Sequence, residues 1–157
     1  MKNNIILEEM RARYIFVVFL VGLTSCRTSK HSVEQPYSNP LLLDKMWAVT
    51  SIKGKEVQYP NQGDVSYFVF SGDRKVKGGG GCNQYSGKFR AVGDSISISD
   101  VVSTRKACPE LKIEEAFFQA IPEVIRFRVS KDNLKFYDKE KREVMNCIYL
   151  DEKDMKE

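Results

Sequence analysis

A glycine-rich segment holds the residues of this 157-residue chain that are most suggestive of chemistry. Four consecutive glycines, residues 78–81, lead directly into Cys82, Asn83 and Gln84. Glycine loops cradle phosphate groups in nucleotide-binding proteins, but a P-loop requires Gly-Lys-Ser or Gly-Lys-Thr at the start of a helix. Here the glycines lead into Cys-Asn-Gln-Tyr and a strand-like sequence. We therefore do not expect a P-loop.

Cys82 has two other chemical roles to consider, those of a nucleophile and of a metal ligand. A nucleophilic cysteine needs a base, normally histidine. The only histidine of the chain is His31, which lies in a polar N-terminal segment. A zinc site needs four ligands, and three separated cysteines without a histidine in the folded region are a poor set. The sequence therefore predicts neither a catalytic cysteine nor a metal site, and it indicates no cofactor.

The carboxylates do not form a pair suited to acid-base catalysis. Asp94 and Asp100 lie at expected turns, and three others belong to an expected helix: Glu114, Glu115 and Glu123. We expect these groups to be solvated or capping. Glu114 falls within the apolar arc of the helix, so its carboxyl group must lie at the edge or be hydrogen-bonded. These residues favour a protein that is not an enzyme.

The N-terminal region has the features of a secretory signal. An apolar run, residues 14–23, follows Arg11 and Arg13. The run is too short for a membrane-spanning helix, which needs about 20 residues. It ends in Leu-Thr-Ser-Cys at Cys26, which resembles the bacterial lipobox. We therefore expect residues 1–25 to be a signal peptide and Cys26 to be lipidated, with the lipid holding the protein on a membrane.

Two further features of this region bear on the start of the chain and on its location. Glu8 and Glu9 dilute the positive charge that a signal peptide needs, so Met10 is an alternative start to Met1. Arg27 does not resemble the aspartate that retains lipoproteins at the inner membrane of enteric bacteria. We expect anchoring to the outer membrane, facing the periplasm, with the cell surface as the alternative.

The remaining cysteines allow at most one internal disulfide. Setting Cys26 aside leaves Cys82, Cys108 and Cys147, and all three pairings are open. We favour Cys82 with Cys108, because both lie at the ends of regular segments, in loops that can meet over one end of a barrel. Cys147 lies inside an expected strand, where a free thiol acts as a small hydrophobe.

Composition divides the chain after the signal into three parts. Residues 26–40 contain the lipidated cysteine and a polar stretch that buries too little surface to fold, which predicts a flexible tether. Residues 41–150 are suited to one domain with one core. Residues 151–157 are a polar tail. The net charge of +4 comes from basic residues interleaved with acidic ones, which indicates no nucleic-acid partner.

Short stretches of alternating apolar residues, each closed by a turn, predict antiparallel strands. Seven or eight of them at this spacing favour a sandwich or barrel over a parallel α/β sheet. The clearest stretches are residues 47–52, 65–70, 89–92, 95–98, 125–129, 134–137 and 144–150. The fold class that we expect is therefore mainly β.

One amphipathic helix is expected after Cys108. Pro109 suits a first helical turn, and Pro122 ends the segment. Its narrow polar face consists of Lys112, Glu115 and Gln119, so most of the helix should pack on the sheet.

The chain contains Gly-Cys-Asn-x-x-x-Gly at residues 81–87, followed by Thr-x-x-Ala-Cys at residues 104–108. With Trp47 before it and Glu114 after it, this combination resembles the META domain of HslJ-like bacterial envelope lipoproteins. The resemblance covers residues 41–150, and the two linked motifs are its most specific part. One departure is Lys106, where methionine is more common. The matching signature residues, which the resemblance implies to define the fold, are Trp47, Gly81, Cys82, Asn83, Gly87, Thr104, Cys108 and Glu114.

The resemblance implies a small antiparallel β-barrel, lipocalin-like in outline, with one packed helix. It also implies a stress-related envelope role and no catalytic residue. We expect a monomer that binds an unknown envelope protein or peptide, like a pilot protein or chaperone, through its barrel end or an exposed strand edge. The alternative is a carrier that holds a small molecule in the barrel interior, where bulky side chains leave little room: Phe68, Phe70, Phe89, Phe127 and Phe136.

Overall fold

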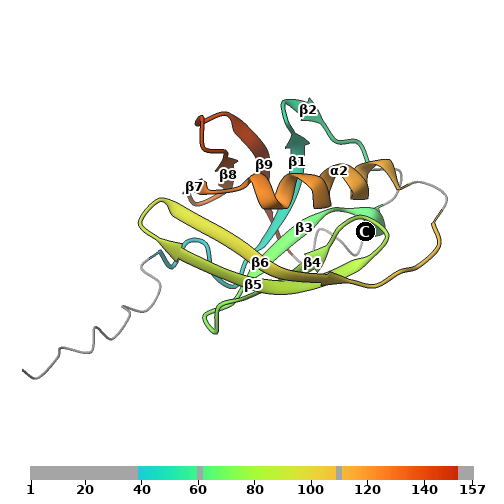
Figure 1. The fold of residues 1–157 in the computed structure, drawn as a ribbon, viewed down its shortest axis with the longest axis horizontal. Coiled ribbons are helices and arrows are strands. Elements are labelled where there is room, and N and C mark those ends of the chain that lie inside the picture. Colours follow the sequence, from blue (N-terminus) through green and yellow to red (C-terminus); the bar gives the residue numbers. More distant parts are fainter. Residues whose placement is uncertain (1–38, 60–61, 109–110, 152–157) are drawn as a thin grey trace, which may run out of the picture. The chain divides into compact units, whose positions relative to one another are not determined.

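The computed structural model describes residues 39–59, 62–108 and 111–151 (Figure 1). The predicted signal peptide, the lipidation site at Cys26 and the tether up to residue 38 lie outside the described residues. The strands are β1 (Met46–Ile52), β2 (Lys55–Glu56), β3 (Tyr67–Phe70), β4 (Lys75–Gly79), β5 (Gln84–Val92), β6 (Ser95–Ser103), β7 (Arg126–Val129), β8 (Asn133–Tyr137) and β9 (Glu143–Leu150). The helices are α2 (Lys112–Ala120) and two single 3₁₀ turns, η1 (Gln62–Asp64) and η2 (Ile121–Glu123).

Eight of the strands close into a small antiparallel barrel, which confirms the predicted fold class. The order is β1-β3-β4-β5-β6-β7-β8-β9, and β9 pairs back onto β1 from Met46↔Leu150 to Ile52↔Met145. Strand β2 pairs only with the end of β1 and extends the sheet as a short hairpin. Helix α2 packs beside the barrel, above β6 in the view of Figure 1.

Four strands differ from the sequence prediction, and one of them is β2, a two-residue strand that was not predicted. Strand β4 was not predicted, because it ends in Gly78 and Gly79, and glycine is depleted from strands. Strand β5 begins at Gln84 and not at residue 89, and β6 continues to Ser103. Their added residues are mainly polar and small, and they become strand through cross-strand pairing with each other, an interaction that apolar alternation does not report.

Aromatic side chains fill the barrel core. All five phenylalanines that were predicted to face the interior are buried: Phe68, Phe70, Phe89, Phe127 and Phe136. The rings of Phe68 and Phe136 lie 5.3 Å apart, and those of Phe70 and Phe89 lie 4.9 Å apart. Phe117 of helix α2 is also fully buried, with its ring 5.0 Å from that of Phe68. The helix therefore contributes directly to the core.

Helix α2 follows the predicted pattern. Lys112, Glu115 and Gln119 are exposed, and the opposite side buries Phe117 and Ala120. Pro122 lies in η2, immediately after the α-helix ends. The predicted role of Pro109 lies outside the described residues. Among residues 39–59, 62–108 and 111–151, no helix has the length and apolar character needed to cross a membrane.

The seam between β6 and β7 differs from the other barrel seams. Strand β6 makes ladder pairs with β5 along most of its length, from Ser95↔Val92 to Ser103↔Tyr85. Its ladder with β7 consists of the single pair Ser95↔Arg126. Because β7 begins at Arg126, the edge of β6 beyond Ile96 faces the chain before β7, including η2, which contacts β6, and it has no strand partner on that side among the described residues.

Candidate functional site

The glycine run forms the end of β4 and the start of the close-packed turn that leads into β5. A Cβ atom on Gly78 would overlap the backbone carbonyl oxygen of Tyr67, and one on Gly80 would lie 2.6 Å from Cζ of Phe118. Gly81 has a φ of +131°, which side chains of L-residues rarely adopt. The absence of Cβ atoms therefore allows β3 and helix α2 to pack closely against the run. This packing offsets the conformational entropy that the four glycines lose on folding.

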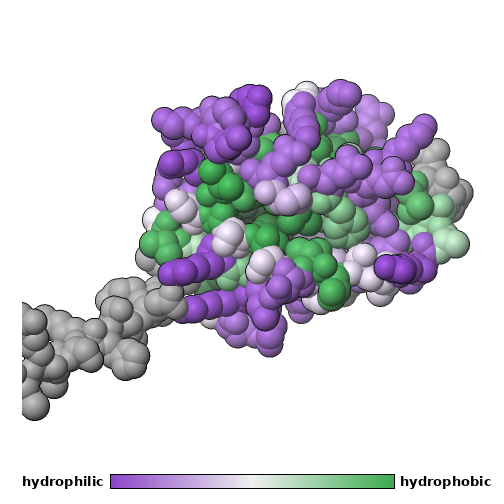
Figure 2. Space-filling view, in the orientation of Figure 1, coloured by the Kyte–Doolittle hydropathy of each residue, from purple (hydrophilic) through white to green (hydrophobic). Residues whose placement is uncertain are grey.

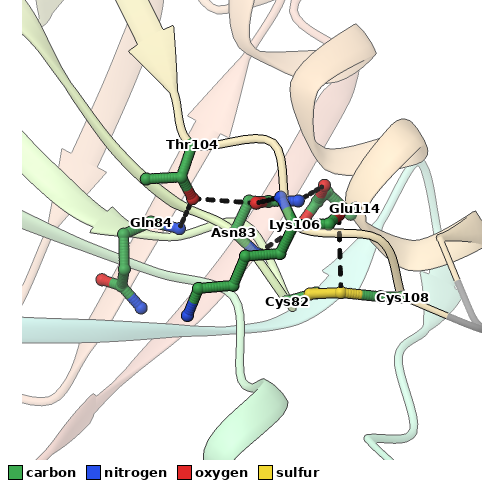
Figure 3. Close-up of a disulfide and its surroundings, with 7 residues drawn as sticks. All are labelled: Cys82, Asn83, Gln84, Thr104, Lys106, Cys108 and Glu114. Carbon is green, nitrogen blue, oxygen red and sulfur yellow. Dashed lines mark hydrogen bonds between the residues drawn. A yellow bond between two sulfur atoms is a disulfide. The ribbon is translucent and has the colours of Figure 1, made fainter.

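Asn83 lies at the centre of the turn and is only 4% exposed. Its backbone N–H donates to Oε2 of Glu114, and its side-chain amide donates to Oε1 of Glu114, each over 2.7 Å (Figure 3). Glu114 is itself buried on helix α2, as its place within the apolar arc requires. The prediction that Glu114 is hydrogen-bonded is confirmed.

The side-chain oxygen of Asn83 binds the segment that follows β6. It accepts hydrogen bonds from Oγ1 of Thr104, at 2.8 Å, and from the backbone N–H of Lys106, at 2.7 Å. Thr104 also pairs with Gln84, because its N–H donates to the Gln84 carbonyl and its Oγ1 accepts from the Gln84 N–H. One asparagine side chain thus joins three segments that are distant in sequence.

Cys82 and Cys108 form a disulfide beside this network (Figure 3), which confirms the favoured pairing. Cys147 is a free thiol, fully buried on β9, and burial raises the pKa of this thiol. The disulfide and the Asn83 network together fasten the turn, the segment after β6 and helix α2 to one another. We call the set Cys82, Asn83, Thr104, Cys108 and Glu114 the signature clamp.

The signature clamp has the chemistry of a structural device. The sulfur of Cys82 is bonded to Cys108, so it offers no thiolate, and both oxygens of Glu114 already accept hydrogen bonds. Within the described residues, no group of three or more His, Cys, Asp or Glu side chains is arranged to hold a metal ion. The arrangement fixes the position of helix α2 against the barrel.

Two predicted signature residues lie away from the clamp. Gly87 is on β5, where its ladder with β6 shifts register, and a Cβ there would lie 2.9 Å from the carbonyl oxygen of Ser99. Trp47 is fully buried on β1, and its indole N–H donates to the carbonyl of Leu42 at 3.0 Å. Gly81, which precedes the clamp residue Cys82, contributes only its backbone conformation, with a φ of +131°.

The other acidic residues singled out in the sequence are on the surface. Asp94 pairs with Arg126 at 2.8 Å, Asp100 with Lys88 at 2.9 Å, and Glu123 with Lys53 at 2.7 Å. Glu115 is exposed. The structure therefore does not bring these carboxyl groups together with the clamp.

Sequence reasoning missed two participants near the clamp. Ser66 is fully buried, and its hydroxyl donates to the carbonyl of Gly80 at 2.8 Å. Lys106 contacts Asn83 through its backbone N–H, so this contact could not be predicted from the type of residue at position 106. A serine just before an apolar strand is the one sequence feature that could have suggested a turn contact at Ser66.

The fold and the clamp together define a class of protein: a small antiparallel barrel to which a single helix is held by a disulfide and a buried asparagine network. The chain belongs to the META domain family, because the family model matches residues 40–147. No curated protein matches the chain.

Solved structures of similar fold share little sequence with this chain. One is the NMR structure of a protein from Burkholderia xenovorans, with 23% identity and a TM-score of 0.57, covering 70% of this chain and 84% of that one. Another NMR structure has 16% identity and a TM-score of 0.55, covering 71% of this chain and 96% of that one. A crystal structure of a DUF4847 family protein from Bacteroides vulgatus ATCC 8482 has 16% identity and a TM-score of 0.50, covering 68% and 93%. At these identities the likeness concerns the fold alone.

Proposed function

We propose that this protein is a non-enzymatic envelope module that binds an extended protein segment by adding it as a strand to the open edge of β6. Lipidation at Cys26 would anchor the module to the outer membrane, with the domain facing the periplasm as a monomer in a stress-related role. The META domain and the barrel support this reading at the level of the family and fold. The open seam between β6 and β7 is the observation that carries it.

The backbone groups at this edge can be identified from their neighbours. The N–H of Ile96 donates to the carbonyl of Ile125, so it points towards β7, and the N–H of Thr104 donates to Gln84, so it points towards β5. Backbone groups alternate in direction along an antiparallel strand. By this alternation, the N–H and C=O groups of Ile98 and Ser103 point away from β5. No pairing with a described residue on the β7 side is present at either position.

The surface beside this edge suits an extended apolar segment. Ile98, Val101 and Phe118 are only partly buried against the core, and Val102, on the outer face of β6, is 66% exposed. Figure 2 shows apolar surface gathered between helix α2 and β6. An added strand would hydrogen-bond to β6 and cover part of this surface with alternate side chains, as in other cases of strand addition. The expected partner sequence therefore alternates between apolar and polar residues.

The alternative of a carrier that uses the barrel interior gains no support from the packing. The interior positions hold the phenylalanines that form the aromatic core. Two grooves, of about 880 and about 460 Å³, are lined mainly by residues outside this aromatic core. A barrel of eight strands has an interior just wide enough for side chains to fill.

The test uses a proline that removes one edge donor. Ser103→Pro eliminates the outward N–H of Ser103 and should leave the β5 ladder intact, because proline is tolerated on the open side of an edge strand. Ser103→Ala keeps the N–H and is the matched control. Peptides selected from a displayed library against the full-length chain in detergent should bind the Ala variant normally and the Pro variant at least about tenfold more weakly, a loss of about 1.4 kcal/mol.

Amide hydrogen exchange supplies the second readout. A bound peptide should slow the exchange of the Ile98 and Ser103 amides, because these groups become hydrogen-bonded. Thermal unfolding of both variants checks that the barrel is intact. Peptide binding that survives Ser103→Pro, or protection that appears elsewhere on the barrel, would contradict strand addition at β6.

A further inference from the structure

The outer face of β4, β5 and β6 contains a broad groove of about 880 Å³. It lies on the opposite side of these strands from the barrel core, because the residues that alternate with the buried Val76 and Phe89 line it. The hairpin between β3 and β4 forms one wall. The groove therefore belongs to the sheet surface and shares no residue with the signature clamp.

Basic side chains predominate along this groove. Five basic residues line it, against two acidic ones, Asp73 and Asp100; the basic residues are Arg74, Lys75, Lys77, Lys88 and Arg90. Asp73 pairs with Lys75 at 2.7 Å, and Asp100 pairs with Lys88 at 2.9 Å. Among the residues that line the groove, basic side chains therefore outnumber acidic ones by three.

The register of the strands places like charges against each other. Lys75 on β4 lies directly opposite Lys88 on β5. Like charges at opposite positions of an antiparallel pair destabilise a sheet. Lys77 is exposed on the same face and forms no ion pair with a residue that the structure describes. The ion pairs with Asp73 and Asp100 offset part of the repulsion between Lys75 and Lys88, and an anion bound between the strands would offset it further.

The remaining lining residues narrow the chemical class of the anion. The hydroxyl groups of Ser86, Ser97 and Ser99 are on the same face and can donate hydrogen bonds. The only aromatic residue of the lining is Phe89, which is buried in the core, so the groove offers no exposed ring on which a base or sugar could stack. Cations on neighbouring strands and at alternate residues lie roughly 5 to 7 Å apart, which suits a ligand with several anionic groups.

We propose that this groove binds a ligand that presents two or more phosphate groups, held by Lys77, Lys88 and Arg90. The phosphates can belong to a soluble oligophosphate or to the headgroups of an anionic bilayer, since the chemistry recognised is the same. The site is independent of the strand addition proposed for the β6 edge, which uses backbone groups and apolar side chains.

The test compares two triple variants of the full-length chain in detergent. Lys77→Gln/Lys88→Gln/Arg90→Gln removes three groove charges, and Lys55→Gln/Lys131→Gln/Lys139→Gln removes three exposed charges elsewhere. Tripolyphosphate binding, measured by calorimetry, should weaken at least about tenfold in the groove variant and change little in the control. The single variant Lys77→Gln should weaken tripolyphosphate binding by a smaller factor, and it keeps the proposal testable if the triple variant does not fold.

A second arm distinguishes the two sources of phosphate. Co-sedimentation with phosphatidylglycerol vesicles and with phosphatidylcholine vesicles is compared for the same variants. A groove-dependent preference for phosphatidylglycerol assigns the site to headgroups, and tripolyphosphate binding without that preference assigns it to a soluble ligand. Equal weakening in both triple variants would overturn the proposal, as would groove-dependent binding of a single-stranded 20-mer oligonucleotide that is tighter than that of tripolyphosphate.

Discussion

Asn83 donates both its backbone N–H and its side-chain amide to the carboxyl group of Glu114, and the two residues are 31 positions apart in sequence. This double contact holds helix α2 against the turn between β4 and β5. Because Asn83 and Glu114 are both buried, neither can exchange its partner for water without local opening.

Removing the Glu114 carboxyl group should destabilise the domain. Glu114→Ala leaves two buried donors of Asn83 without acceptors, and we expect a loss of about 2–4 kcal/mol in the free energy of unfolding. Urea denaturation measures it. Glu115→Ala changes an exposed residue of the same helical turn and should stay within about 0.5 kcal/mol of the wild type. Similar losses in the two variants would show that the double contact has little energetic weight.

The disulfide variants should be coupled. Cys82→Ser and Cys108→Ser each open a loop of sequence separation 26. Each should cost about 3–4 kcal/mol in the chain-entropy model. The double variant should cost about as much as either single one, because the same bond is lost. Cys147→Ser removes a buried free thiol on β9, so its cost should add to that of Cys82→Ser, and non-additivity there would contradict the assignment of the free cysteine.

Replacing a glycine with alanine should lower the free energy of unfolding most where the new Cβ atom would meet backbone atoms. In Gly78→Ala the new Cβ meets the backbone carbonyl of Tyr67, which cannot move without disturbing β3. We expect a loss of about 2–3 kcal/mol, measured by thermal unfolding. Gly72→Ala is the control, because no atom lies within 4 Å of its Cβ position. That variant should be unchanged or stabilised by up to about 1 kcal/mol.

Asp138 should make stability dependent on acidic pH. Partial desolvation of its carboxyl group raises the pKa, but hydrogen bonds from the backbone N–H and the guanidinium of Arg142 outweigh it and hold the pKa below its ordinary 3.8. A depressed pKa in the folded state contributes stability above the unfolded-state pKa, and this contribution is lost as the pH falls through the folded-state pKa.

The measurement is the melting temperature between pH 7 and pH 2. The wild type should lose more stability over the acidic part of this range than Asp138→Asn, which has no carboxyl group to protonate. Asp132→Asn, at an exposed position in the turn before β8, is the matched control and should follow the wild type. Parallel curves for the wild type and Asp138→Asn would contradict the role of Asp138.

Much of the fold could be predicted because burial leaves a periodic trace in the sequence. The alternation in residues 65–70 and 125–129 reports one buried face of a strand, and Phe117 and Ala120 fall on the buried face of the helix. Glu114 stood out as a carboxyl group on that face, but its partner could not be predicted. The bidentate contact depends on a turn that brings Asn83 beneath the helix.

Sequence patterns alone were sufficient for the mainly β class, the single helix and the limit of one internal disulfide, because periodicity and cysteine number are properties of the chain itself. The strand at Gly78 and Gly79, the single pair Ser95↔Arg126 in the β6–β7 seam, and the opposition of Lys75 and Lys88 emerged only from the packed barrel. Each depends on which distant segments meet and in what register. The periodicity of a segment indicates which of its residues are buried, but it does not identify the distant residues that pack against them or pair with them.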